Sequence, residues 1–214
     1  DSFAFSGSTG PVWQPGDRVT ALLPAFINVN RFETRSKTQN DRWQSWDYGV
    51  APQVRYAAQD WLSLNLAMTV GRRLYYSESA KDATFASVSP GVDITTPAAG
   101  TFTFGASAGR ELARASVFAN HSAGVNVGWQ YAFAQGLVVS AYGSYTDVKY
   151  DRNESAYAEA RHDRRTVAGL DMIYAWQALQ ADILLSYAHT WNRSNLPIYA
   201  YDRDTISVAI RKAF

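Results

Sequence analysis

The chain alternates between hydrophobic and polar residues over long stretches. In residues 61–71, every second side chain is apolar, and the residues between them are polar or small. The same alternation occurs in residues 18–29, 123–133 and 179–188, and again up to the last residue. A period of two is that of a β-strand with two different faces, whereas a helix repeats about every 3.6 residues. The pattern therefore predicts a chain built from amphipathic strands.

The connections between these stretches alternate in length. A short connection rich in Gly, Pro or Ala follows one strand, and a longer, more charged connection follows the next. Such spacing is typical of consecutive antiparallel hairpins. The expected strands are residues 2–13, 17–32, 43–56, 61–76, 83–95, 101–112, 120–133, 137–150, 157–175, 179–191 and 199–214. The sequence thus predicts an all-β, antiparallel, up-and-down sheet with about eleven strands visible.

The location of the polar face distinguishes two kinds of β-protein. In a soluble sandwich or barrel the polar face lies outside, whereas an outer-membrane barrel turns it toward a wet lumen. The expected strands exceed the usual length of about 5–6 residues and suit a tilted membrane strand, which needs about 9–11. Charges also lie in mid-strand on the polar face, at Arg55, Arg73, Asp93, Asp171 and Asp182, where a dry core would not tolerate them. Both features favour the outer-membrane barrel.

Aromatic residues lie near both ends of the expected strands, on the apolar face. Near the short connections they are Trp13, Tyr56, Phe102, Tyr131, Phe133, Tyr174, Trp176 and Phe214. Near the long connections they are Trp46, Tyr48, Tyr145, Tyr187 and Trp191. Two aromatic belts around an aliphatic band are typical of transmembrane β-barrels. We therefore expect a barrel in a bacterial outer membrane, in contact with membrane lipid and lipopolysaccharide. Pro52 and Pro90 interrupt the apolar face, since proline removes a ladder donor.

The last strand ends on an aromatic residue of the apolar face. Ile206, Val208, Ile210 and Phe214 share this face. Outer-membrane barrels commonly end in such a residue, and this resemblance to the class implies that the barrel-assembly machinery recognises the strand. The four residues are therefore the expected assembly signal.

The alternation also turns a set of charged residues toward the proposed lumen. They are Arg18, Arg55, Arg73, Asp93, Glu111, Arg161, Asp163, Arg165, Asp171, Asp182 and Arg211. Both signs occur, whereas a strongly selective pore would show one dominant sign at its constriction. Two interpretations stay open: ladders of opposite charge that brace the wall, and a role in conduction. Asp171 and Asp182 both point inward near the short connections, and we expect Arg211 on the last strand to be their neighbour.

The parity of the strands bears on the extent of the barrel. If the short connections are periplasmic, the alternation places the start of the strand at 2–13 outside the cell. Single-chain bacterial barrels have an even number of strands. We therefore expect residues 1–214 to be a barrel portion that lacks an odd number of N-terminal strands. A miscounted hairpin around residues 111–119 is the alternative.

Four short motifs occupy the last third of the chain. They are Arg161-His162-Asp163-Arg164-Arg165, the stretch WNRSNLPIY from Trp191 to Tyr199, Tyr201-Asp202-Arg203-Asp204 and Arg211-Lys212-Ala213-Phe214. They resemble the barrel of the surface lipoprotein assembly modifier (Slam) family, although exopolysaccharide-export barrels end in similar ways. The resemblance implies a barrel of about fourteen strands that follows a periplasmic tetratricopeptide domain. This chain has no such helical repeat and fewer strands, and both departures would follow if N-terminal parts are missing.

Composition excludes several kinds of chemistry. The 214-residue chain contains no Cys, which excludes disulfides, thiolate metal sites and Cys nucleophiles. Its net charge of +1 argues against binding to nucleic acid. The spacing of His121, His162 and His189 indicates no metal site. Residues 105–109 (GASAG) match the spacing of a nucleophile elbow but lie inside an alternating strand instead of a strand-to-helix turn. We expect no enzyme activity, cofactor or metal.

The leading functional hypothesis is a translocon-like barrel that assists export or surface display of lipoprotein or protein substrates. A passive pore or an exopolysaccharide-export barrel is the alternative, and a structural or adhesive barrel is another. A barrel hydrolase is less favoured. Its paired carboxylates would be Glu154, Glu159, Asp163 and Asp202, but arginines lie between them and indicate ion pairs instead.

Overall fold

A computed structural model describes residues 2–33, 42–76, 78–176 and 180–212, and its strands form one sheet. The strands are β1 (Ser2–Thr9), β2 (Val12–Gly16), β3 (Val19–Leu22), β4 (Ala25–Glu33), β5 (Arg42–Val50), β6 (Gln53–Gln59), β7 (Leu62–Tyr75), β8 (Ala83–Thr96), β9 (Gly100–Ala113), β10 (Asn120–Ala132), β11 (Leu137–Tyr150), β12 (His162–Trp176), β13 (Ala181–Ser194) and β14 (Tyr201–Lys212). Three-residue 3₁₀ turns lie in connections: η1 (Ser79–Lys81), η2 (Ala134–Gly136) and η4 (Pro197–Tyr199). Within the described ranges, no helix has the length and hydrophobicity needed to span a membrane.

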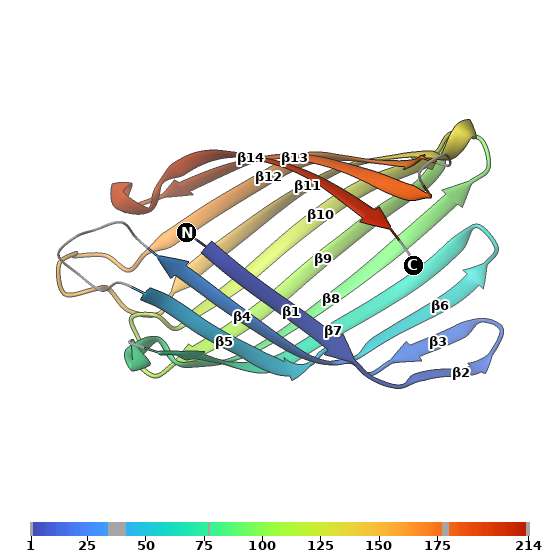
Figure 1. The fold of residues 1–214 in the computed structure, drawn as a ribbon. Helices are drawn as coiled ribbons and strands as arrows, with labels where there is room; N and C mark the ends of the chain where they lie inside the picture. Colours follow the sequence, from blue (N-terminus) through green and yellow to red (C-terminus); the bar gives the residue numbers. More distant parts are fainter. Residues whose placement is uncertain (1, 34–41, 77, 177–179, 213–214) are drawn as a thin grey trace.

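The fourteen segments make eleven crossings of the sheet. The hydrogen-bonded order is β1-β4-β5-β7-β8-β9-β10-β11-β12-β13-β14, and each neighbouring pair is antiparallel. The short segments β2, β3 and β6 continue β1, β4 and β5 after a break in each (Figure 1). The prediction of an all-β antiparallel sheet with eleven strand crossings is therefore confirmed. One boundary differs clearly, because the strand expected from residue 157 begins at His162.

Three breaks lie side by side, and each contains a proline. Pro11, Pro24 and Pro52, which we call the proline line, interrupt three neighbouring crossings at the same level. Proline has no N–H to donate to a ladder, but its carbonyl still accepts. Leu23 N donates to Pro11 O at 3.1 Å, Ala51 N to Pro24 O at 2.8 Å, and Met68 N to Pro52 O at 2.9 Å. At the proline line the regular ladders stop, and one hydrogen bond to each proline carbonyl still joins the neighbouring crossings.

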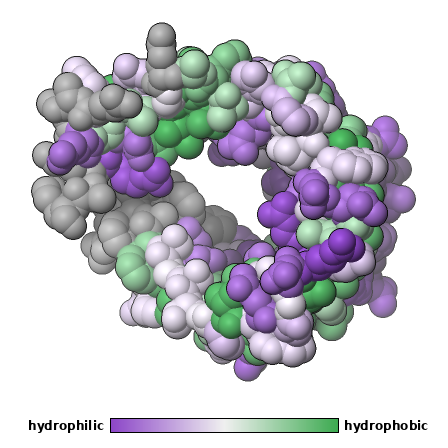
Figure 2. All heavy atoms as spheres, turned by 90° about the vertical axis from the view of Figure 1, so that its right-hand side faces the viewer, coloured by the Kyte–Doolittle hydropathy of each residue, from purple (hydrophilic) through white to green (hydrophobic). Residues whose placement is uncertain are grey.

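The sheet curls around a central hollow. Short connections gather at the right-hand end of Figure 1 and long connections at the left-hand end. Figure 2, viewed from the short-connection end, shows an opening bordered largely by hydrophilic side chains. Among the described residues, no hydrogen-bonded ladder joins β1 to β14, so the sheet is not closed. Ten antiparallel steps separate these two strands, and they therefore run in the same direction.

The two faces of the sheet have opposite chemistry. On β7, Leu64, Leu66, Met68 and Val70 share the outer face and are each 43–47% exposed. Aromatic side chains on the outer face lie toward both ends of the strands, and the exposed ones include Trp46, Tyr48, Tyr145, Tyr187, Tyr174 and Trp176. Within the described residues, buried hydrophobic side chains are limited to Ala83, Ala119, Ala181 and Leu196. The apolar surface of this fold therefore lies mainly on its outside.

Candidate functional site

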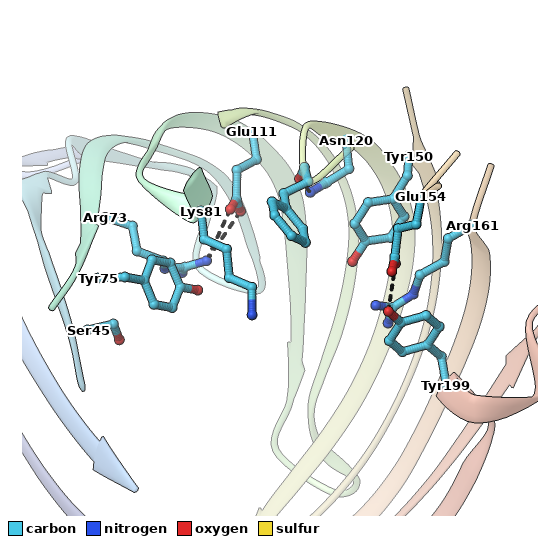
Figure 3. Close-up of a pocket in the computed structure, with 11 residues that line it drawn as sticks. Ser45, Arg73, Tyr75, Lys81, Glu111, Asn120, Tyr150, Glu154, Arg161 and Tyr199 are labelled. Atoms are coloured by element: carbon cyan, nitrogen blue, oxygen red, sulfur yellow. Dashed lines mark hydrogen bonds and ion pairs between the residues drawn. The ribbon is translucent and has the colours of Figure 1, made fainter. Parts of the chain in front are cut away.

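The concave face carries the polar half of each strand. On β7, Arg73 and Tyr75 point into the hollow near the long connections (Figure 3). Because side chains alternate along a strand, Ser63 and Asn65 share their face. The register aligns Asn65 with Arg55, and Ser63 with Asp93, so these charges lie on the concave face as well.

Arg73 binds two carboxylates from two other strands. Its Nε and Nη2 donate to the two carboxylate oxygens of Asp47 on β5, each at 2.9 Å. Its Nη1 lies 3.4 and 3.3 Å from the two oxygens of Glu111 on β9. A guanidinium presents its donors in a planar fork that suits two such partners. This Arg73 cluster (Arg73, Asp47 and Glu111) ties β5, β7 and β9 together across the intervening β8.

Two aromatic rings and one glycine support the Arg73 cluster. The Phe85 ring on β8 lies 5.6 Å from the Arg73 guanidinium and 6.4 Å from the ring of Phe26. A Cβ at Gly71 would approach Phe85 Cζ to 2.7 Å, so the glycine leaves room for the ring. The guanidinium therefore has carboxylates along its edge and an aromatic ring near its face, an arrangement that holds it in one position.

A second cluster lies on the other side of the hollow mouth. Arg161, just before β12, donates to Asp163 with its Nε 2.8 Å from Oδ2. Its guanidinium lies 3.6 Å from the centre of the Tyr199 ring and 4.8 Å from that of Tyr150. The Tyr199 hydroxyl donates to Glu154 Oε1 at 2.6 Å. This hydrogen bond to a carboxylate raises the pKa of Tyr199 to about 12. We call these five residues the Arg161 cluster.

The two clusters enclose a cavity of about 390 Å³ (Figure 3). Its lining also includes Lys81, whose ammonium lies 5.3 Å from the centre of the Phe118 ring and forms an ion pair with Glu78. The cavity thus presents both signs of charge among aromatic rings. The carboxylates of Glu111 and Glu154 are each engaged by a neighbouring donor. Such an arrangement braces a wide mouth and gives it a polar surface without a ring of one sign.

Other charged pairs lie closer to the short connections. Asp93 accepts from Asn65 at 2.7 Å and from Thr103 at 2.8 Å, and it lies 3.9 Å from Arg55. At the sheet edge, Arg211 donates to Asp182, one of its two expected neighbours, at 2.6 and 3.1 Å. Opposite charges therefore face each other across strands at several levels of the concave face.

The remaining predicted residues differ in placement. Arg18 lies in the turn between β2 and β3 and not on a strand. Arg165 and Asp171 share the concave face of β12 with Asp163, and Asp171 lies opposite Ser140 and Ser186. Ile206, Val208 and Ile210 are exposed on the outer face of β14, whereas Phe214 lies outside the described residues. The described residues contain no group of three or more His, Asp or Glu that could hold a metal ion.

Sequence reasoning missed several residues of the cavity. The missed lining residues are Tyr75, Lys81, Tyr150, Glu154 and Tyr199 as members of one site, and Asp47, which binds Arg73 behind the lining, was missed as well. Asp47 had a detectable signal, because it alternates with the outward Trp46 and Tyr48. Tyr199 ends one of the four motifs and begins the strand expected at residues 199–214, but neither signal places it beside Glu154, because it lies in the 3₁₀ turn η4 and β14 begins at Tyr201.

Comparison with known proteins decides the family. The family model described as surface lipoprotein assembly modifier matches residues 24–214. The chain belongs to the surface lipoprotein assembly modifier family. The match includes the motifs of the last third and extends over most of the sheet, from the start of β4 onward.

Structural likeness and curated sequences add less. The solved structure of LpxR from Salmonella typhimurium is similar, with a TM-score of 0.47 and 12% sequence identity over 96% of this chain and 87% of that chain. A comparison with curated proteins finds no match.

Proposed function

We propose that the chain forms the membrane wall of an outer-membrane machine that moves lipoprotein or protein substrates to the cell surface. The family match over residues 24–214 is the observation that carries this proposal. The exposed hydrophobic outer face supports a membrane location, because water would not favour such a surface. The hydrophilic hollow offers a polar surface that a substrate could pass.

The mixed charge of the hollow favours translocation over a selective pore. Arg73, Asp93 and Arg211 are each matched by an opposite charge within 4 Å. A polar wall whose charges are matched in this way attracts neither cations nor anions strongly. We therefore propose a non-enzymatic role in which the wall positions and shields a substrate.

A site-specific block tests this proposal. The sequence contains no Cys, so one introduced cysteine gives a single attachment point. Ser107 lies in mid-strand on the concave face of β9, beside Gly124, and its neighbour Ala106 faces outward beside Val125. A bulky maleimide-linked polymer on Ser107→Cys is expected to stop surface display of lipoprotein. The same treatment of Ala106→Cys is the matched control and should leave display intact.

Deletion of the gene should reduce surface lipoprotein while its total amount stays the same. Heat-modifiable migration on a gel tests the membrane barrel separately. Unchanged display in the deletion strain, or in cells with a labelled Ser107→Cys chain, would defeat the proposed function.

A further inference from the structure

A group of basic residues lies on the outer face of the sheet at the long-connection end. Lys149 on β11 is in register with His162 on β12, and Arg164 on β12 is in register with Arg193 on β13. We call these four residues the basic cluster. They alternate with inward residues such as Asp163, so they point away from the hollow. The lumenal clusters therefore do not include them.

The positive charge of this cluster exceeds the nearby negative charge. Asp147 faces three of its members: His162 Nε2 lies 2.7 Å from Oδ2, and Lys149 and Arg164 each lie 3.9 Å from a carboxylate oxygen. Asp202 lies 3.7 Å from Arg193. Two carboxylates thus face three permanent cations and a histidine. The side chains of Arg164 and Arg193 are 62% and 69% exposed, so their guanidinium groups are accessible to a ligand.

Three of the four members of the cluster line a cavity on the outer face. This cavity of about 260 Å³ is lined by His162, Arg164, Arg193, Ser194 and Asn195. Asn195 fixes one side, because its side chain accepts from His162 N at 2.8 Å and donates to Ala160 O at 3.0 Å. Asn195 N also donates to His162 O at 3.2 Å. The start of β12 and the end of β13 are therefore tied together before any ligand binds.

The position along the strands points to a lipid headgroup. Tyr145, Thr166 and Trp191 form an outward row across β11, β12 and β13. Arg164 and Arg193 lie two residues beyond this row, about 7 Å farther along the strands. Directly below the row, His189 on β13 pairs with Asp204 on β14 at 2.7 Å, and farther along the same face Leu170 and Leu185 are exposed. Aromatic rows mark the boundary between acyl chains and headgroups, so the cluster lies at headgroup level.

We propose that the basic cluster binds the phosphate groups of lipopolysaccharide in the surrounding outer leaflet. The proposal rests on the outer-membrane location proposed above, with the long connections outside the cell as is typical of such barrels. Guanidinium groups bind phosphate with paired hydrogen bonds, and basic pockets beside membrane-spanning elements bind anionic headgroups. The acyl chains of the same molecule would lie against the apolar surface below. An acidic protein would make no use of that apolar surface, which is why we assign the site to a lipid.

Binding of lipopolysaccharide to the purified, detergent-solubilised protein tests the site. We expect Arg164→Ala combined with Arg193→Ala to weaken binding about 30-fold, since each basic residue near such a surface contributes about a factor of five. Arg165→Ala is the matched control, because Arg165 adjoins Arg164 but faces the hollow. It should bind like the unchanged protein. Equal binding by the double variant and the unchanged protein would overturn the proposal.

A second comparison needs no substitution. The unchanged protein should bind dephosphorylated lipopolysaccharide as weakly as the double variant binds the intact lipid, and equal affinity for both lipids would refute the phosphate site. Arg164→Lys with Arg193→Lys keeps both charges and should keep most of the binding. Heat-modifiable migration verifies that each variant is folded. The measurement involves no lipoprotein cargo, so its outcome is independent of the surface-display test.

Discussion

Arg73 shows how one side chain can join distant parts of this chain. Its guanidinium binds Asp47, 26 positions away in sequence, and Glu111, 38 positions away. The Asp47 side chain is largely buried, and hydrogen bonds that involve charged groups contribute more than neutral ones. Loss of the guanidinium would leave two carboxylates close together without their shared partner. Arg73 therefore contributes more to the stability of the folded sheet than its place in an alternating pattern suggests.

Replacement of Arg73 by Ala should destabilise the folded sheet by about 2–3 kcal/mol, because Asp47 loses a bidentate partner. The midpoint of urea unfolding, followed by gel migration, measures this change. Arg165→Ala removes the same type of side chain from the concave face of β12 and should shift the midpoint little. Equal shifts for both variants would contradict the assigned role of the Arg73 cluster.

At the scale of elements, the close approach of neighbouring strands depends on glycine. Gly49 on β5 is in register with Gly71 on β7. A Cβ built at Gly49 would lie 2.1 Å from Val70 O and 2.6 Å from Gly71 Cα. Both are backbone atoms, so relief requires the strands to move apart. Gly49 thus sets the spacing between β5 and β7 close to the point where the proline line begins.

Gly49→Ala should therefore cost about 1–3 kcal/mol of stability, which is typical of overpacked sites. Gly16→Ala is the control, since a Cβ there has no atom within 4 Å. Thermal unfolding of the two variants, compared with the unchanged protein, measures the difference. A Gly49→Ala protein as stable as Gly16→Ala would show that the two strands tolerate a wider spacing.

At the scale of the whole molecule, the fold has its apolar surface outside and its polar surface inside. Leu66 and Ala67 are adjacent on β7 and point to opposite sides, so they allow the two surfaces to be compared at one level of the sheet.

Leu66→Arg should reduce the stability of the folded protein in a bilayer by about 2–4 kcal/mol, because a charge near the middle of the lipid face is poorly solvated. Ala67→Arg places the same charge in the hollow and should cost much less. The folded fraction of each variant in lipid vesicles measures its loss of stability. A larger loss for Ala67→Arg than for Leu66→Arg would contradict the assignment of the outer and inner faces.

Much of this architecture could be predicted from the sequence, because a period of two fixes both the type of element and the face of each residue. The eleven crossings follow from it, and so does the placement of Asp182 and Arg211 on one face of the sheet. The register between strands does not, so the meeting of Arg73 with Asp47 was not predictable. The alternation begins at Arg18 and so predicts it on a strand face, but the chain turns at Asp17 and Arg18 after β2 ends at Gly16. The turn that brings Tyr199 to Glu154 has no periodic pattern at all.

The proline line has a consequence for how the wall opens. Beyond it, β2 and β3 pair only at Val12–Leu22, Trp13–Ala21 and Gly16–Val19, whereas β7 to β13 are joined by long ladders. Of these long ladders, the one between β8 and β9 is interrupted at Ser89 and Pro90. Local unfolding costs least where few backbone hydrogen bonds must break together. The amide protons of β2 and β3 should therefore exchange with solvent deuterium far sooner than those of β9 or β10. Each of the first three crossings then has two segments, one on either side of the proline line, whose backbone hydrogen bonds open at different rates. The remaining crossings open as one cooperative unit.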